Sequence, residues 1–240
     1  MMALRVIARL LDYPDPELFA HQSALIAALE SAAELEPHHR TQLRGFIQCF
    51  CARPLLDVQA EYCELFDRGR ATSLLLFEHV HGESRDRGQA MVDLMAQYRR
   101  AGLEIDSREL PDFLPMYLEY LASGSPAQAR SGLQDVAPIL ALLGERLNNR
   151  QSAYSVLFDI LLALSGSGIQ AAALQQQVAA EARDDTPQAL DAVWEEEQVK
   201  FLGEQGCASA QQAAHQRRHA HAVAPQYLDV AQAMPGRKGG

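Results

Sequence analysis

The sequence is poor in the residues that favour β-strands. Its 240 residues include 11 Val, 7 Ile and 3 Thr, against 38 Ala and 33 Leu, and aromatic residues make up 7%. β-branched and aromatic residues are enriched in strands, whereas Ala and Leu are strong helix formers. Residues 74–77 are the one short stretch that has the composition of a strand. The composition therefore predicts an all-α protein.

Cysteines and long apolar runs are also scarce. The four cysteines are too few for the disulfide framework of a secreted protein of this size. The longest mainly apolar run, residues 156–164, is interrupted by Asp159 and is far shorter than the roughly 20 residues of a membrane-spanning helix. Arg9 and Asp12 interrupt what would be the apolar part of a signal peptide. We therefore expect a cytoplasmic protein that does not insert into a membrane.

Basic residues are outnumbered by acidic ones. The chain has 21 Lys and Arg against 31 Asp and Glu, for a formal net charge of −10. The acidic excess lies before Gly203, because residues 203–240 contain four basic and two acidic residues. Nucleic-acid binding requires a basic surface, so the acidic body argues against it. A basic partner and solubility alone are both compatible with this charge.

Motifs of the common enzyme classes are missing. The chain has no G-x-S-x-G, no H-E-x-x-H, no Walker loop and no G-x-G-x-x-G. Cys49 and Cys51 would lie about 200° apart on a helix, so they cannot both face one metal ion, and we interpret them as buried free cysteines. His215 and His219 have helical spacing, but they belong to a stretch that we interpret as solvated. The sequence thus predicts no enzyme, no metal site and no stably bound cofactor.

Helix boundaries are marked by capping residues. Asp15, Ser125 and Thr186 each precede a proline, which places a side-chain acceptor at the N-cap and proline at the first helical position. Gln128 completes a capping box with Ser125. Apolar residues recur with helical spacing between these signals. They predict helices around residues 4–11, 18–29, 43–50, 58–66, 91–98, 113–121, 133–147, 154–164, 169–182 and 187–202.

The helix pattern ends before the chain does. Residues 154–164 are apolar on almost every side, so we expect this helix to be central. Residues 203–240 are rich in Ala, Gln, His and Gly and show no sustained stripe. We predict one bundle-like domain of roughly eight to ten helices over residues 1–202, followed by a flexible tail over residues 203–240.

Two stretches mix charged, aromatic and apolar residues densely. Residues 62–85 include histidines and charges of both signs around an apolar quartet, and residues 109–121 contain a Pro-Asp pair at the start of a predicted helix. Asp112 and Glu119 are seven residues apart, which predicts that they share one side of a helix. A simple connector and a helix with an ordinary core face would also account for these stretches.

These stretches resemble the NarJ family, the nitrate reductase molybdenum cofactor assembly chaperones, also called nitrate reductase delta subunits. The most specific signature consists of LFDRGRATSL at residues 65–74 and FEHVHGESRDRG at residues 77–88. LPDFLP at residues 110–115, with YLEYL at residues 117–121, resembles a Pro-Asp motif. The family shares this motif with the TorD and DmsD types of redox-enzyme maturation chaperone. The family's C-terminal segment is similar to DAVWEEEQVKF at residues 191–201. The resemblance covers about residues 4–202.

The resemblance implies an all-helical chaperone that is not an enzyme. Such a protein binds, in the cytoplasm, the N-terminal segment of the catalytic α subunit of a respiratory nitrate reductase. It keeps the unfinished subunit ready for insertion of molybdenum guanine dinucleotide and for iron–sulfur cluster loading, before the subunit docks to the membrane. Proteins of cofactor biosynthesis are further candidate partners.

The resemblance implies that the partner segment is a short basic amphipathic helix, and such a helix would bind an apolar groove with an acidic rim. His79 and His81 titrate near neutral pH, so we expect binding to weaken as the pH falls from about 8 to 6. A general adaptor for some other amphipathic helix would have the same fold and the same groove. The candidate partner-peptide-binding residues are Tyr62, Phe66, Asp67, Arg68, Arg70, Phe77, Glu78, His79, His81, Glu83, Asp112, Met116, Tyr117 and Glu119.

Overall fold

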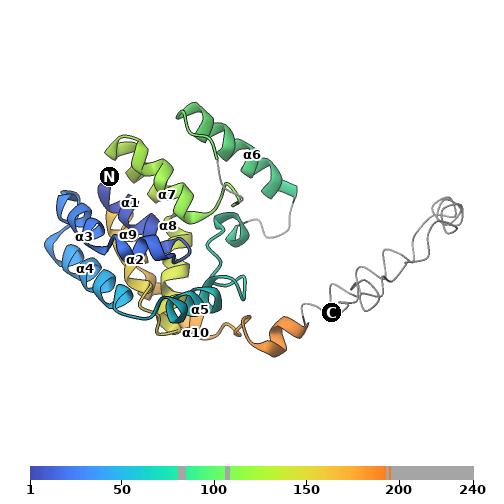
Figure 1. The fold of residues 1–240 in the computed structure, drawn as a ribbon. Helices are drawn as coiled ribbons and strands as arrows, with labels where there is room; N and C mark the ends of the chain where they lie inside the picture. The colour runs from blue at the N-terminus through green and yellow to red at the C-terminus, as the bar shows by residue number, and fades with distance from the viewer. Residues whose placement is uncertain (81–84, 106–108, 193–194, 196–240) are drawn as a thin grey trace, which may run out of the picture. The chain divides into compact units, whose positions relative to one another are not determined.

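A computed structural model describes residues 1–80, 85–105, 109–192 and 195 (Figure 1). Helices and short 3₁₀ turns dominate this part of the chain, and no strand occurs among the described residues, so the all-α prediction is confirmed. The elements are α1 (Met2–Leu11), α2 (Pro16–Ala20), α3 (Gln22–Ser31), α4 (Pro37–Cys51), α5 (Leu55–Phe66), η1 (Leu76–His79), α6 (Arg85–Arg100), α7 (Leu114–Ser123), α8 (Pro126–Asn149), α9 (Ser155–Ser165), η2 (Ala171–Leu174) and α10 (Gln175–Ala179).

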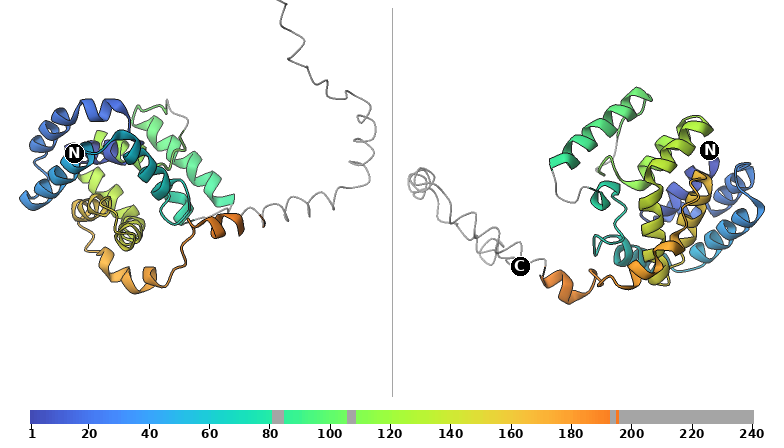
Figure 2. Two further views of the ribbon diagram at one scale, coloured as in Figure 1. Left: turned by 60° about the horizontal axis from the view of Figure 1, so that its bottom comes forward. Right: turned by 180° about the vertical axis from the view of Figure 1, so that it is seen from behind.

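The core of the unit Met1–Leu190 is built around α1, α8 and α9. α8 packs along α9, α1 contacts α7 and α3, and α4 contacts α9. Leu4 and Ile7 of α1 and Phe158 and Leu161 of α9 are fully buried, which confirms that residues 154–164 form a central helix. In Figures 1 and 2, α3 and α4 lie side by side at one edge of this unit.

Two glycines allow α8 to approach its neighbours closely. A Cβ atom at Gly132 would clash with a methyl carbon of Leu121 on α7, so the Leu121 side chain would have to move. The Tyr117 hydroxyl of α7 donates a hydrogen bond to the carbonyl oxygen of Gly132 at 3.1 Å. A Cβ atom at Gly144 would come within 3.1 Å of Phe158 Cβ on α9. The absence of a side chain at these positions therefore sets the spacing of the three helices.

The predicted capping residues act as expected. Asp15 Oδ1 accepts a hydrogen bond from the N–H of Leu18 at 2.7 Å. Ser125 and Gln128 form the complete capping box at the start of α8. Thr186 Oγ1 accepts from the N–H of Ala189 at 3.2 Å. These three helix starts were predictable because the contacts that form them span only three residues.

Several local predictions need correction. The helix expected at residues 169–182 is only a 3₁₀ turn followed by the five-residue α10, because the segment lacks a continuous apolar stripe. Cys49 is free but exposed rather than buried, because Phe46, Ile47 and Phe50 form the inward face of α4. Cys51 is likewise free and only half-buried.

The remaining predictions concern the C-terminal part and membrane insertion. A helical turn follows Thr186, and residues 191, 192 and 195 of the second unit are helical, whereas the predicted tail at residues 203–240 lies outside the described residues. Among the helices that the structure describes, none is both long enough and apolar enough to cross a bilayer.

Candidate functional site

The two stretches singled out in the sequence meet through backbone hydrogen bonds. Leu75 and Phe113 form an isolated antiparallel bridge. The N–H of Leu76 donates to the carbonyl oxygen of Asp112 at 3.0 Å, and the N–H of Leu114 donates to that of Leu74 at 2.8 Å. Residues 74–77, expected as the only possible strand, thus pair briefly and then turn into η1. This pairing joins the start of α7 to the loop between α5 and η1, residues 67–75, which we call the signature loop.

Asp112 is the buried centre of this junction. Its Oδ2 accepts a hydrogen bond from the N–H of Phe77 at 3.0 Å, and the side chain has no solvent exposure. Burial raises the pKa of the Asp112 carboxyl group, against the opposing effects of the Phe77 N–H and of Arg87. α7 begins at Leu114, so Asp112 lies outside the helix and Glu119 is exposed on it. The prediction that the two acids share one helix side was therefore wrong.

Arg87 of α6 is the cation beside Asp112. Its Nη1 lies 3.4 Å from Oε1 of Glu78, and its Nη2 lies 3.9 Å from Oδ2 of Asp112. The side chains of Arg87 and Glu78 are each 19% exposed. Sequence reasoning missed Arg87, although it lies within the signature at residues 77–88, where the acids were noticed and the base was not.

His79 faces inward rather than toward a charged rim. Its Nε2 donates a hydrogen bond to the carbonyl oxygen of Ser73 at 2.8 Å. Burial lowers the pKa of the His79 imidazole, which therefore stays neutral to lower pH than an exposed histidine. The loss of partner binding expected between pH 8 and 6 therefore depends less on His79 than the sequence predicts. His81 and Glu83 lie outside the described residues.

Three of the predicted aromatic residues belong to the core. The Tyr62 hydroxyl donates to the carbonyl oxygen of Leu11 at 3.0 Å, and the Phe66 ring lies edge-on to Tyr154, 5.1 Å between centroids. Tyr117 is buried between α7 and α8. In this conformation Tyr62, Phe66 and Tyr117 support the fold and do not wall a surface groove. Phe77 is half-buried against the core.

The charged residues after α5 are exposed. Asp67, Arg68 and Arg70 all lie on the surface. Arg68 forms an ion pair with Glu64 one helical turn earlier, 3.8 Å between Nη1 and Oε1. Exposed pairs of this kind contribute little to stability, so the Arg68 side chain can exchange this pair for a partner contact at little cost.

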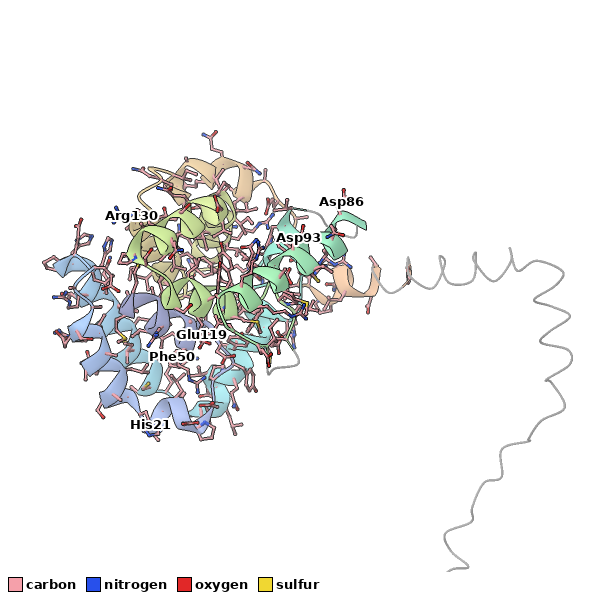
Figure 3. All side chains as sticks on the ribbon, turned by 90° about the horizontal axis from the view of Figure 1, so that it is seen from above. His21, Phe50, Asp86, Asp93, Glu119 and Arg130 are labelled. Atoms are coloured by element: carbon pink, nitrogen blue, oxygen red, sulfur yellow. The ribbon has the colours of Figure 1, made fainter. Side chains whose placement is uncertain are left out.

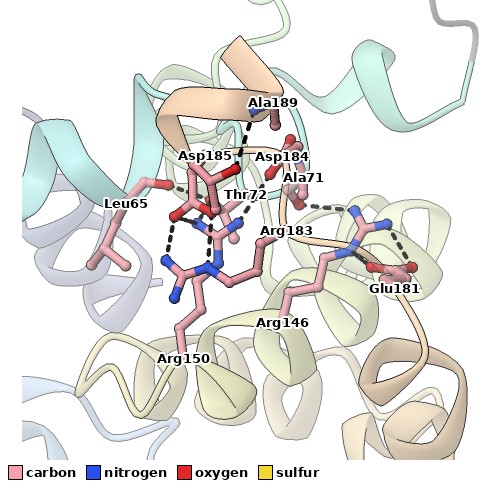
Figure 4. A network of polar contacts seen from close by, with 11 residues as sticks. Leu65, Ala71, Thr72, Arg146, Arg150, Glu181, Arg183, Asp184, Asp185 and Ala189 are labelled. Carbon is pink, nitrogen blue, oxygen red and sulfur yellow. Dashed lines mark hydrogen bonds and ion pairs between the residues drawn. The ribbon is translucent and has the colours of Figure 1, made fainter. Parts of the chain in front are cut away.

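The start of the signature loop is held by an acidic segment, residues 181–185 (Figure 4). The N–H of Ala71 donates to Oδ2 of Asp184 at 2.7 Å, and Nη1 of Arg146 donates to the carbonyl oxygen of Ala71 at 2.8 Å. Arg146 also forms two hydrogen bonds with Glu181, at 2.7 and 2.9 Å. Paired guanidinium–carboxylate bonds of this length are strong and directional.

Arg150, the C-cap residue of α8 and four residues after Arg146, completes this network. It donates to Oγ1 of the buried Thr72 at 2.9 Å and to Oδ1 of Asp184 at 3.2 Å, and it lies 3.5 Å from Oδ2 of Asp185. The Thr72 hydroxyl in turn donates to the carbonyl oxygen of Leu65. The two arginines thus connect α8, the signature loop and the acidic segment, a contact set that the sequence analysis did not identify.

A surface groove lies between the end of α6, the loop after it and α7. We call it the α6–α7 groove; its volume is about 650 Å³. The Tyr98 and Tyr120 rings are 4.9 Å apart, and the Tyr98 hydroxyl donates to the carbonyl oxygen of Pro111 at 2.7 Å. Glu119 is exposed on α7 (Figure 3). The lining residues are Arg5, Tyr98, Leu103, Glu104, Ile105, Met116, Glu119, Tyr120 and Ser123.

The residues of the predicted site lie in two different places. Met116 and Glu119, both predicted from the sequence, line it, whereas Asp112 and Glu78 lie in the buried junction behind the signature loop. Tyr98 was expected to be part of an ordinary helix stripe. The end of α6 therefore adds a groove wall that no motif had indicated.

One group of side chains has the composition of a metal site. Glu36, His38 and His39, at the start of α4, place their potential ligand atoms within 4.8 Å of one another. Glu36 and His38 are exposed. Burial and the neighbouring His38 lower the pKa of His39, and His38 lies 3.4 Å from Glu36. We interpret this arrangement as a surface ion pair and assign no metal ion to it.

Comparisons with known proteins place these features in a family. The family model described as "Nitrate reductase delta subunit" matches residues 32–159. The chain is 57% identical over 230 residues to the nitrate reductase molybdenum cofactor assembly chaperone NarJ of Escherichia coli strain K12, covering 96% of this chain and 98% of that protein. It is 53% identical over 232 residues to the probable chaperone NarW of the same strain, covering 96% and 97%. A probable NarJ of Bacillus subtilis is 29% identical over 154 residues, 64% of this chain and 83% of the relative.

Proposed function

The chain belongs to the nitrate reductase delta subunit family, and on this basis we propose that it is an assembly chaperone for a respiratory nitrate reductase. It binds the N-terminal segment of the catalytic α subunit in the cytoplasm and keeps that subunit open for the molybdenum cofactor until the subunit docks to the membrane. The observation that carries the proposal is the similarity, over nearly the whole chain, to relatives named as molybdenum cofactor assembly chaperones. These relatives are named as chaperones rather than enzymes.

We assign the α6–α7 groove as the place where the partner segment docks. Its floor is formed by Leu103, Ile105, Met116 and Tyr120, which supply apolar and aromatic surface, whereas Tyr98 is buried and packs against Tyr120. An amphipathic helix binds such a surface by laying its apolar side chains into it. The apolar floor accounts for affinity, because desolvated aromatic and aliphatic anchors dominate binding energy.

The charge around the groove matches a basic partner. Glu104 and Glu119 line it and are exposed, and within the described part of the chain Arg5 is the one basic residue of the lining. The net charge of −10 attracts a basic segment over a longer range. Rim charges of this kind increase the association rate and the selectivity more than the final affinity.

Calorimetric titration with a synthetic peptide of the α-subunit N-terminus tests this proposal. We expect saturable one-to-one binding, and no binding of a scrambled peptide. Met116→Asp puts a charge on the apolar floor and should weaken binding at least about tenfold, since burying an unpaired charge is strongly unfavourable. Val92→Asp is the matched control, because Val92 is exposed on α6 and does not line the groove.

The outcomes separate the alternatives. Unchanged affinity of Met116→Asp would exclude the groove while leaving peptide binding in place. Equal affinity for an unrelated basic amphipathic helix would support a general adaptor instead. Failure of the folded wild-type protein to bind the α-subunit peptide would contradict the proposed partner segment.

A further inference from the structure

Glu78 and Asp112, the two acids of the buried junction, already pair with a cation of the chain itself. Arg87 approaches both Glu78 and Asp112, at 3.4 and 3.9 Å. Asp112 is fixed from the other side by the N–H of Phe77, so its carboxylate is held in one orientation. Because both acids pair with the guanidinium of Arg87, the chemical group that this site accepts is a guanidinium.

Arg87 fills this site poorly. Its contacts are longer than the paired bonds of 2.7 and 2.9 Å that Arg146 forms with Glu181. Within the described part of the chain, Nε of Arg87 and Oδ1 of Asp112 are both buried without a hydrogen-bond partner. A guanidinium placed for two parallel bonds to a carboxylate would satisfy the Asp112 oxygen and form a stronger pair.

The helix that carries Arg87 is held by few buried side chains. Leu94 and Tyr98 are the buried residues of α6 among those described, and both lie in its second half. Asp86 and Asp93 are on its solvent side (Figure 3). The views in Figures 1 and 2 place α6 at the periphery of its unit. The first half of α6 can therefore separate from the junction without exposing a large apolar surface.

We propose that the Glu78–Asp112 pair is a subsite for an arginine of the partner segment, and that Arg87 closes this subsite in the free protein. The inference rests on the proposed function and extends it, because it assigns one side chain of the basic partner to one pair of acids. When the segment docks in the α6–α7 groove, its guanidinium replaces that of Arg87 and the first half of α6 moves away. Arg87 is thus an internal competitor that is displaced only by a partner with an arginine.

The affinity of an Arg87→Gln variant distinguishes a competitor from a merely structural residue. Removing the competitor leaves the acids unpaired in the free protein, so the α-subunit peptide should bind about fivefold more tightly, the effect of an ion pair worth about 1 kcal/mol. A structural role predicts weaker binding. Arg99→Gln on the same helix is the control with the same charge change, and it should leave affinity unchanged.

Further variants, a modified peptide and hydrogen exchange test the same assignment independently. The gain from Arg87→Gln should disappear in an Asp112→Asn background, and it should also disappear for a peptide whose arginines are replaced by the uncharged citrulline. If Arg87→Gln does not fold, Arg87→Lys retains the charge but lacks the fork, and it should show a smaller gain. In the wild type, hydrogen exchange of the amides in the first half of α6 should become faster when the peptide binds.

The outcomes distinguish failure of the arginine subsite from failure of the proposed function. Binding by the wild type that is unchanged or weaker in Arg87→Gln would overturn the arginine subsite and leave the proposed function intact. Slower exchange in the first half of α6 on binding would also overturn the subsite. Absence of peptide binding by wild type and Arg87→Gln alike would overturn both proposals.

Discussion

At the residue scale, burial separates the side chains that the sequence grouped together. Asp112 and Glu119 belong to one motif, yet the first is enclosed at the junction and the second is exposed in the groove. Tyr117 is buried, whereas its neighbour Met116 lines the groove. The sequence identified the residue types correctly, but which side of a segment faces the core depends on tertiary packing that short spacings do not encode.

His79 predicts a pH dependence of stability. Burial lowers the pKa of its imidazole in the folded protein below the ordinary value of about 6.5, so below pH 6.5 the unfolded chain binds more protons than the folded one. The free energy of unfolding should therefore decrease as the pH falls through this range. We expect the decrease to be smaller in His79→Gln, which can still donate to Ser73, when urea unfolding is compared at pH 7.5, 6.5 and 5.5. Parallel curves for the two proteins would contradict this assignment.

At the element scale, local signals predicted helix starts and long-range contacts escaped prediction. The capping box at Ser125 involves residues three apart, so it is visible in the sequence. Arg146 instead pairs with Glu181 and with the backbone at Ala71, 35 and 75 residues away. No sequence pattern connects such distant positions unless the fold is already known.

Arg150 provides a test of the network around the acidic segment. Its side chain is only 9% exposed and contacts Thr72, Asp184 and Asp185, so Arg150→Ala should lower the free energy of unfolding by about 2–4 kcal/mol. Arg183→Ala is the comparison, because Arg183 also binds Asp185 but is 63% exposed, and its loss should cost about 1 kcal/mol or less. Urea titrations followed by circular dichroism measure both. Equal losses for the two variants would show that Arg150 has no special role.

At the scale of the whole molecule, the fold was predictable and the binding surface only partly so. Amphipathic stripes and the apolar residues 154–164 determine an all-α unit with a central α9, as the structure confirms. The groove combines Met116 and Glu119 of a predicted motif with Tyr98, Leu103 and Ile105, which lie outside any motif. A surface assembled from separate segments becomes visible only when those segments are placed in space.

We propose that this chain prepares a nitrate reductase for its molybdenum cofactor. The most direct measurement is the molybdenum content per catalytic subunit, by mass spectrometry, in reductase purified from cells that lack their own assembly chaperones. We predict a high content when this chain is supplied, and a low content without it or with Met116→Asp, whereas Val92→Asp should act like the wild type. An equal molybdenum content with and without the chain would contradict this function.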